Sequence, residues 1–228
     1  MKKLTHDQAA ETFLLSAVLA LGGGFLDAYT YLTRGGVFAN AETGNMVLLG
    51  IQLLRGNWGR ALTYLVPILA FALGVWVAEA VCARFSKHPG VHWRQLTLGG
   101  EVLVVAAVAF LPETLNMLAN VLVAFVCAVQ VESFRRVRGN AFASTMCTGN
   151  LRSGTEQLFY YRRTGDQAVR NNALCYYGII AVFIAGAALG AITCDALGRK
   201  AALVCAAILL AGCFILSLRG ERKLEEET

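Results

Sequence analysis

Two copies of the tripeptide Thr-Gly-Asn, Thr43-Gly44-Asn45 and Thr148-Gly149-Asn150, interrupt a chain that is otherwise strongly apolar. Threonine is a good N-cap for a helix, and glycine accepts the backbone angles that a break demands. The free N–H groups at a helix start, with the positive end of the helix dipole, attract an anion or another polar solute. We therefore expect each copy to begin a short helix whose first turn binds a solute.

A purely structural role for the tripeptide is the alternative. A helix start followed by a turn also uses Asn and Thr side chains to satisfy backbone groups. The sequence leaves both roles open. Two copies at matched positions support the binding role more than a single copy would.

Asp27 is a carboxylate inside the first apolar run, where such residues are rare and usually face the interior of a helix bundle. A deep Asp27 would suit proton or ion coupling. If the helix ends early, at Gly22-Gly23-Gly24, Asp27 would only cap it at the membrane interface. Gln130 holds a similar place in a later run, so we expect both to face the same region. The candidates for a solute path are therefore Asp27, Asn40, Thr43, Gly44, Asn45, Gln130, Thr148, Gly149 and Asn150.

Motifs of the common enzyme and metal classes are not visible. The sequence has no zinc-ligand spacing, nucleophile elbow or triad pattern, and its glycine-rich stretches lack the ending of a phosphate loop. The seven cysteines lie mostly in apolar runs, which is typical of packing residues. We expect no catalytic residue, no metal site and no cofactor, so the chain is predicted not to be an enzyme; an intramembrane enzyme ranks third among the functions considered.

The composition indicates an integral membrane protein. Hydrophobic residues make up 57% of the 228, and charged residues only 15%, where a soluble domain has about a quarter. A membrane-crossing helix needs about 20 apolar residues. Six runs qualify, and the first is read as an uncleaved helix rather than a secretory signal. They are Thr12–Leu32, Ala61–Ala83, Leu96–Leu111, Thr114–Ser133, Asn171–Cys194 and Ala201–Leu218.

Two further apolar segments, Ala41–Leu54 and Ala141–Tyr161, carry the Thr-Gly-Asn copies and are poor candidates for full crossings. With six spans and both termini cytoplasmic, 15 of the basic residues fall inside and 5 outside, as the positive-inside rule requires. With eight spans they divide 10 and 10. Seven spans with an outside N-terminus give 14 and 6, so this rival stays open. We expect the two segments to be short or re-entrant helices.

The two halves of the chain resemble each other. Phe38-Ala39-Asn40 matches Phe142-Ala143-Ser144 upstream of the two tripeptides, and small residues recur downstream at helical spacing. These small residues, which let helix backbones approach closely, are Ala70, Gly74, Ala78, Gly186 and Gly190. Three crossings per half would give inverted repeats, a plan common in transporters. The predicted parts are residues 1–112 and 113–218 as the halves, and 219–228 as a charged cytoplasmic tail.

Other charged residues are given structural roles. Glu132 is expected to pair with the arginines at 135 and 136, and Glu101 to lie near a membrane interface. Arg152 and Glu156, one helical turn apart, are expected to pair on a buried polar face.

The sequence resembles the YoaK-like family of bacterial multi-pass membrane proteins, a domain of unknown function. The matching features are Gly24-Phe25-Leu26-Asp27, Phe38 through Asn45, and the run around Gln130 leading to the second tripeptide; the resemblance extends from Leu14 to Leu218. Cys127 departs from the family, which usually has glycine there. The resemblance implies an inner-membrane location and no established substrate.

We therefore predict a small-solute transporter or channel of the inner membrane, with a polar path between the halves. The alternative is a non-transporting membrane sensor, scaffold or partner subunit. The expected partners are the lipid bilayer and a small polar or anionic solute. Nucleic acid is not expected, because the net charge of +5 is explained by topology. A homodimer, joined through the small-residue helices, would complete a pathway that one short chain leaves incomplete.

Overall fold

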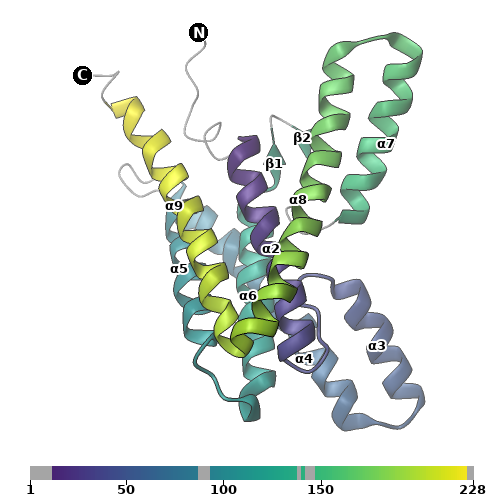
Figure 1. Ribbon diagram of the computed structural model, residues 1–228, viewed down its shortest axis with the longest axis vertical. Coiled ribbons are helices and arrows are strands. Elements are labelled where there is room, and N and C mark those ends of the chain that lie inside the picture. The colour runs from purple at the N-terminus through teal and green to yellow at the C-terminus, as the bar shows by residue number, and fades with distance from the viewer. Residues whose placement is uncertain (1–11, 87–92, 138–139, 142–146, 225–228) are drawn as a thin grey trace.

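The computed structural model describes residues 12–86, 93–137, 140–141 and 147–224, and the side chains of 12–86, 93–135 and 147–218. These residues form an almost entirely helical fold (Figure 1). The helices are α2 (Phe13–Thr33), α3 (Glu42–Leu54), α4 (Trp58–Phe85), α5 (Trp93–Val108), α6 (Asn116–Ser133), α7 (Cys147–Thr164), α8 (Gln167–Leu197) and α9 (Ala202–Leu224), with the 3-10 turns η1 (Glu113–Leu115) and η2 (Gly198–Ala201). The strands β1 (Arg136–Val137) and β2 (Asn140–Ala141) pair antiparallel in a short ribbon that the sequence did not predict.

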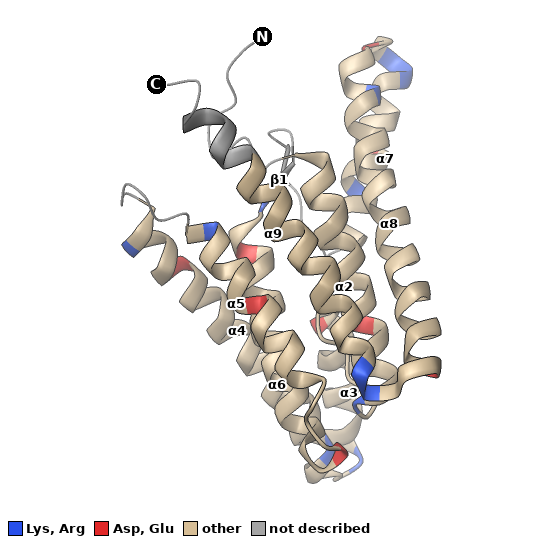
Figure 2. Ribbon diagram, turned by 60° about the vertical axis from the view of Figure 1, so that its left-hand side comes forward, with Lys and Arg blue, Asp and Glu red and all other residues tan. Residues whose placement is uncertain are grey.

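The helices have the length and surface of membrane helices. Within the described residues, four stretches are long and apolar enough to cross a bilayer, which confirms the predicted membrane class. They are Phe13–Thr33, Trp58–Phe85, Glu113–Ser133 and Gln167–Leu218, the last of which runs through α8, η2 and α9. Large apolar side chains such as Trp76, Leu103 and Ile192 point outward from the bundle. Figure 2 shows long stretches of helix with no charged residue, and Lys and Arg towards helix ends.

Short turns fold two helices back on their neighbours. Gly56 follows α3 and Gly165 follows α7, each with a φ of 70°, which side chains with a Cβ rarely adopt. Each glycine reverses the chain, so that α3 packs along α4 and α7 along α8. The two segments that carry Thr-Gly-Asn are therefore helices, and each forms a hairpin with the long helix that follows it.

The helices of the first half, α2–α5, and those of the second half, α6–α9, make matching contacts. Helix α2 packs along α8 and α4 packs along α6, while α5 meets α9; α2 also contacts α9, as α5 contacts α6 (Figure 1). If α2, α4 and α5 are exchanged with α6, α8 and α9, the same set of helix pairs results. In Figure 1 the turn between α3 and α4 lies at the lower end of the molecule, and the turn between α7 and α8 at the upper end.

Glycines allow the two longest helix crossings. A Cβ on Gly24 of α2 would clash with the Phe183 carbonyl of α8, and a Cβ on Gly186 of α8 would clash with the Leu21 carbonyl of α2. Gly74 of α4 lies in the same way against the Phe125 carbonyl of α6. The predicted close approach is therefore correct. The faces that make it are buried within the chain, so they are not free to join a second copy as the sequence had suggested.

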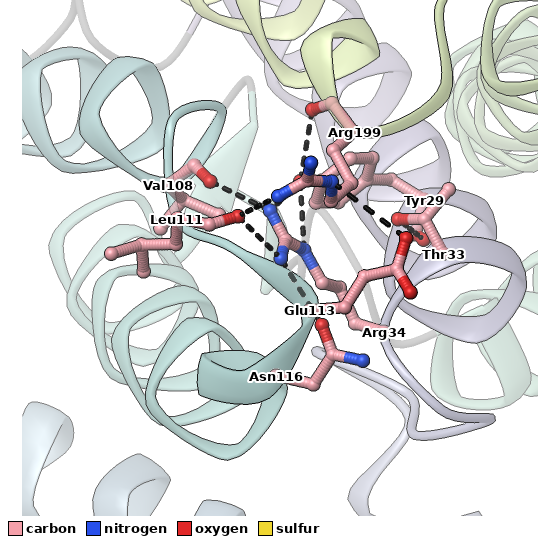
Figure 3. Close-up of polar contacts among 8 residues, drawn as sticks. All are labelled: Tyr29, Thr33, Arg34, Val108, Leu111, Glu113, Asn116 and Arg199. Carbon is pink, nitrogen blue, oxygen red and sulfur yellow. Dashed lines mark hydrogen bonds and ion pairs between the residues drawn. The ribbon is translucent and has the colours of Figure 1, made fainter.

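Arg34, just after α2, is fully buried and ties four segments together (Figure 3). Its Nη2 donates to the Val108 carbonyl at 2.7 Å, and its Nη1 donates to the Leu111 carbonyl at 3.1 Å, so the guanidinium caps the C-terminal end of α5. Nη1 also donates to Asn116 Oδ1 at 3.1 Å. The carbonyl of Arg34 in turn accepts from Asn120 Nδ2 at 2.8 Å.

Tyr29 extends this cluster to η2, the turn between α8 and α9. Its hydroxyl accepts from Nε and Nη2 of Arg34, at 3.0 and 2.7 Å, and donates to the Arg199 carbonyl at 3.1 Å. Arg199 Nη1 donates at 2.7 Å to the same Leu111 carbonyl that Arg34 binds, and Arg199 Nε lies 3.9 Å from Glu113 Oε1 (Figure 3). The ends of α2, α5 and α8 are thus held by one buried hydrogen-bond cluster.

We predict that Gly24→Ala and Gly186→Ala destabilise the protein by roughly 1–3 kcal/mol each, because overpacking forces the backbones of α2 and α8 apart. Gly100→Ala is the matched control: it lies within α5 and has no atom within 4 Å of a new Cβ. Its expected effect is neutral or stabilising. Thermal unfolding of the purified protein in detergent measures the difference, and equal effects at Gly24 and Gly100 would contradict the crossing geometry.

We predict that Arg34→Met costs about 3 kcal/mol, because it removes the hydrogen bonds that the buried guanidinium donates to Tyr29, Val108, Leu111 and Asn116. Arg60→Met, at an exposed position near the start of α4, should leave the unfolding temperature almost unchanged. Comparison of the two variants in the same detergent tests the prediction. A similar small shift for both would mean that the Arg34 cluster does not hold the helix ends.

Candidate functional site

A cavity of about 640 Å³ lies where the first turns of α3 and α7 meet the C-terminal part of α2. Phe71 of α4 and Phe183 and Ala187 of α8 form part of its wall. Part of its lining comes from α2, from the segment before α3, and from the starts of α3 and α7: Asp27, Asn40, Glu42, Thr43, Cys147, Thr148 and Gly149. Both tripeptides thus reach one cavity, although they are far apart in the sequence.

Asp27 binds the backbone that leads into α3. Helix α2 continues unbroken through its three glycines to Thr33, so Asp27 lies inside the helix, and its side chain is buried. Its Oδ1 accepts from the Asn40 N–H at 2.8 Å, and the N–H groups of Ala39 and Ala41 lie beside the same carboxylate. Asn40 Nδ2 donates to the Gly23 carbonyl at 3.2 Å. Asp27 and Asn40 together fix the approach to α3 against α2.

Asn45 shapes the segment before α3 from the other side. It is fully buried, and it binds both backbone groups of Phe38: Nδ2 donates to the carbonyl at 2.7 Å, and Oδ1 accepts from the N–H at 3.2 Å. Nδ2 also donates to Glu42 Oε2 at 3.0 Å. Gly44 lies beneath the Phe38 ring, where a Cβ would come within 3.2 Å of it. Neither Asn45 nor Gly44 lines the cavity; they hold in place residues that do.

The tripeptides lie two residues further into their helices than the sequence predicted. Helix α3 begins at Glu42, with Ala41 as its N-cap and no side-chain cap, so Thr43 lies in the first turn rather than before it. Helix α7 likewise begins at Cys147, before Thr148. In the first half, the Asp27 carboxylate accepts from the N–H of Asn40, just before the N-cap Ala41, and so fixes the backbone that leads into the helix.

The second half contributes fewer candidates to the cavity. Thr148 and Gly149 line it, whereas Asn150 is buried next to them and does not. Gln130 is buried on α6 and is also not part of the lining. Phe142-Ala143-Ser144, the match to the segment before α3, lies outside the described residues.

Glu42 is the acidic site residue that the sequence analysis missed, although it lies directly before Thr43. Its side chain lines the cavity, and burial raises its pKa, with the charge of Asp27 adding to the effect. Among the residues that the structure describes, no Lys, Arg or His lines the cavity. The described residues also contain no group of three His, Cys, Asp or Glu that could hold a metal ion.

The expectations for four other charged residues are met only in part. Glu132 pairs with Arg135 at 2.9 Å, as predicted. Glu101 is buried within α5, not near an interface as predicted, because α5 packs between α6 and α9 and turns this residue inward. Arg152 and Glu156 are both exposed, so the predicted buried pair is wrong.

Comparison with known proteins agrees with these features. The family model described as protein of unknown function (DUF1275) matches residues 15–216, which is most of the chain. The UPF0700 transmembrane protein YoaK of Bacillus subtilis (strain 168) is 26% identical over 192 residues, covering 78% of this chain and 84% of that protein. No solved structure matches the chain. The apolar helices, the buried Asp27 and the paired tripeptides are thus features of a membrane protein that belongs to the YoaK-like DUF1275 family.

Proposed function

We propose that the protein moves a small polar solute across the bacterial inner membrane and that the cavity at Asp27 is its central binding site. The observation that carries the proposal is the meeting of both tripeptide-bearing helix starts with Asp27 at one cavity. In membrane proteins, irregular backbone occurs only where it is buried or lines a cavity, and transporters place such breaks at their binding sites. The proposal assigns the chain no catalytic chemistry.

We further propose six crossings, arranged as two inverted halves. The reciprocal contacts of α2–α5 and α6–α9 support this arrangement, as does the opposite direction of α2 and α6 in Figure 1. Helix α3 has 13 residues and spans about 20 Å, too short to cross the roughly 30 Å hydrocarbon core, which supports a re-entrant helix. The excess of basic residues on one side supports cytoplasmic termini. The path for the solute then runs between the halves.

Labelling of single cysteines tests the inversion. We predict that Asn57→Cys, in the turn between α3 and α4, reacts with a membrane-impermeant maleimide added to intact cells. Thr164→Cys, at the end of α7, should react only after the inner membrane is permeabilised. Labelling of the parent protein gives the background from its native cysteines. Reaction of both positions from the same side would rule out the six-span arrangement.

Flux through purified protein in proteoliposomes tests transport. We predict that a panel of radiolabelled amines, amino acids, sugars and carboxylates contains at least one solute whose uptake needs the protein. Asp27→Asn should reduce that uptake by at least about tenfold, because ionisable groups within a bundle act directly on the solute or its coupling ion. Asn45→Ala should also reduce the uptake, because the segment from Phe38 to Ala41 loses the two hydrogen bonds that Asn45 makes to the Phe38 backbone.

Glu156→Gln is the matched control for these variants, since Glu156 is an exposed acid on α7 outside the cavity. Its uptake should equal that of the parent. If no solute of the panel moves, and the protein instead purifies in a fixed ratio with another membrane protein, the chain is a partner subunit and the transport proposal is wrong.

A further inference from the structure

We propose that the cavity binds a small organic ammonium ion: a protonated primary amine attached to an aromatic or aliphatic body. This inference rests on the proposed function, because it names the class of solute for the same site. It departs from the anionic solute that the sequence suggested. The reasons are the charge of the cavity, its unfilled hydrogen-bond acceptors and the chemistry of its walls.

The charge of the cavity is acidic. Asp27 reaches it from α2 and Glu42 from the first residue of α3, and the described residues provide no basic side chain to its lining. The N–H groups ahead of α3, which would otherwise attract an anion, already face the Asp27 carboxylate. The protein's own carboxylate therefore takes the place of an anionic solute, and an added anion would meet two acids.

Two side chains that line the cavity each carry a buried acceptor atom without a hydrogen-bond partner. Asn40 is 5% exposed, and its Oδ1 is buried without a hydrogen-bond partner; Glu42 Oε1 is also buried without one. Both residues line the cavity. Buried acceptors without a partner are costly, so a ligand that donates hydrogen bonds to these side chains offsets that cost. An ammonium group carries several N–H donors and a positive charge, so it supplies both donors for Asn40 and Glu42 and a counter-charge for Asp27.

The remaining wall is apolar and aromatic. The rings of Tyr31 and Phe38 stack with centroids 4.9 Å apart, and Phe71 of α4 and Phe183 of α8 also line the cavity. A volume of about 640 Å³ accommodates an organic molecule and lies within the usual range for ligand pockets. Aromatic faces attract cations as well as apolar groups. Such walls suit the carbon body of an amine better than the water shell of an inorganic ion.

Calorimetric titration of the detergent-purified protein with three matched probes tests the proposal. They are 2-phenylethylammonium, the neutral 2-phenylethanol and the anionic phenylacetate, which share a phenyl body and differ in charge. We expect the ammonium probe to bind at least about tenfold more tightly than the alcohol, since it alone pairs with the carboxylates, and phenylacetate not to bind. Equal binding of the alcohol or of phenylacetate would overturn the proposal.

Glu42→Gln should weaken the binding of 2-phenylethylammonium by at least about tenfold, because it removes a charge and keeps the shape. Glu156→Gln should bind as the parent does. Glu42 is chosen because Asp27 also holds the segment before α3, and a matching unfolding temperature checks that the variant is folded. Unchanged binding in folded Glu42→Gln would show that the cavity does not recognise the ammonium group.

Flux of the same probes separates this inference from the proposed function. Protein-dependent and Asp27-dependent uptake of a sugar or a carboxylate, without binding of the amine, would leave transport standing and overturn the choice of solute. Binding of the amine without flux of any solute would support the ammonium site and contradict transport.

Discussion

The contact between α2 and α8 at Gly24 and Gly186 is the constraint on which the cavity depends. Because neither glycine has a Cβ, the two backbones meet directly beside the wall of the cavity. Asp27 and Ala28 follow Gly24 by one turn on α2, and Phe183 and Ala187 lie on either side of Gly186 along α8. A wider crossing would move Phe183 and Ala187 away from Asp27 and Ala28, and the cavity would lose the wall that α8 provides.

The helices and the meeting of the tripeptides could be predicted because their signals are local and strong. Long apolar runs mark helices directly, and a motif repeated at matched places indicates one shared region. The Arg34 cluster could not be predicted, because its acceptors are backbone carbonyls at Val108 and Leu111, which no sequence pattern identifies. Glu101 was misplaced for a related reason: only the packing of α5 decides which way it faces.

The structural and binding roles of Thr-Gly-Asn are divided among its residues in the first half. Asn45 imitates a neighbouring peptide group by binding both the N–H and the carbonyl of Phe38, and Gly44 gives room for the ring above it. Thr43 alone reaches the cavity. The structural role and the binding role are therefore not rival explanations. The hydrogen bonds of Asn45 hold the segment before α3, and with it Asn40 and Glu42, where these two side chains line the cavity.

Buried charge is balanced differently at Arg34 and at the cavity. Arg34 spreads its charge over carbonyl groups at the end of α5 and over Tyr29 and Asn116, so its hydrogen-bonding groups are used within the protein. Asp27 and Glu42 have hydrogen bonds but, within the described residues, no basic side chain beside them. A buried charge is costly unless a counter-charge balances it. In the ammonium site that we propose, the ligand supplies this counter-charge, since no basic side chain among the described residues lines the cavity.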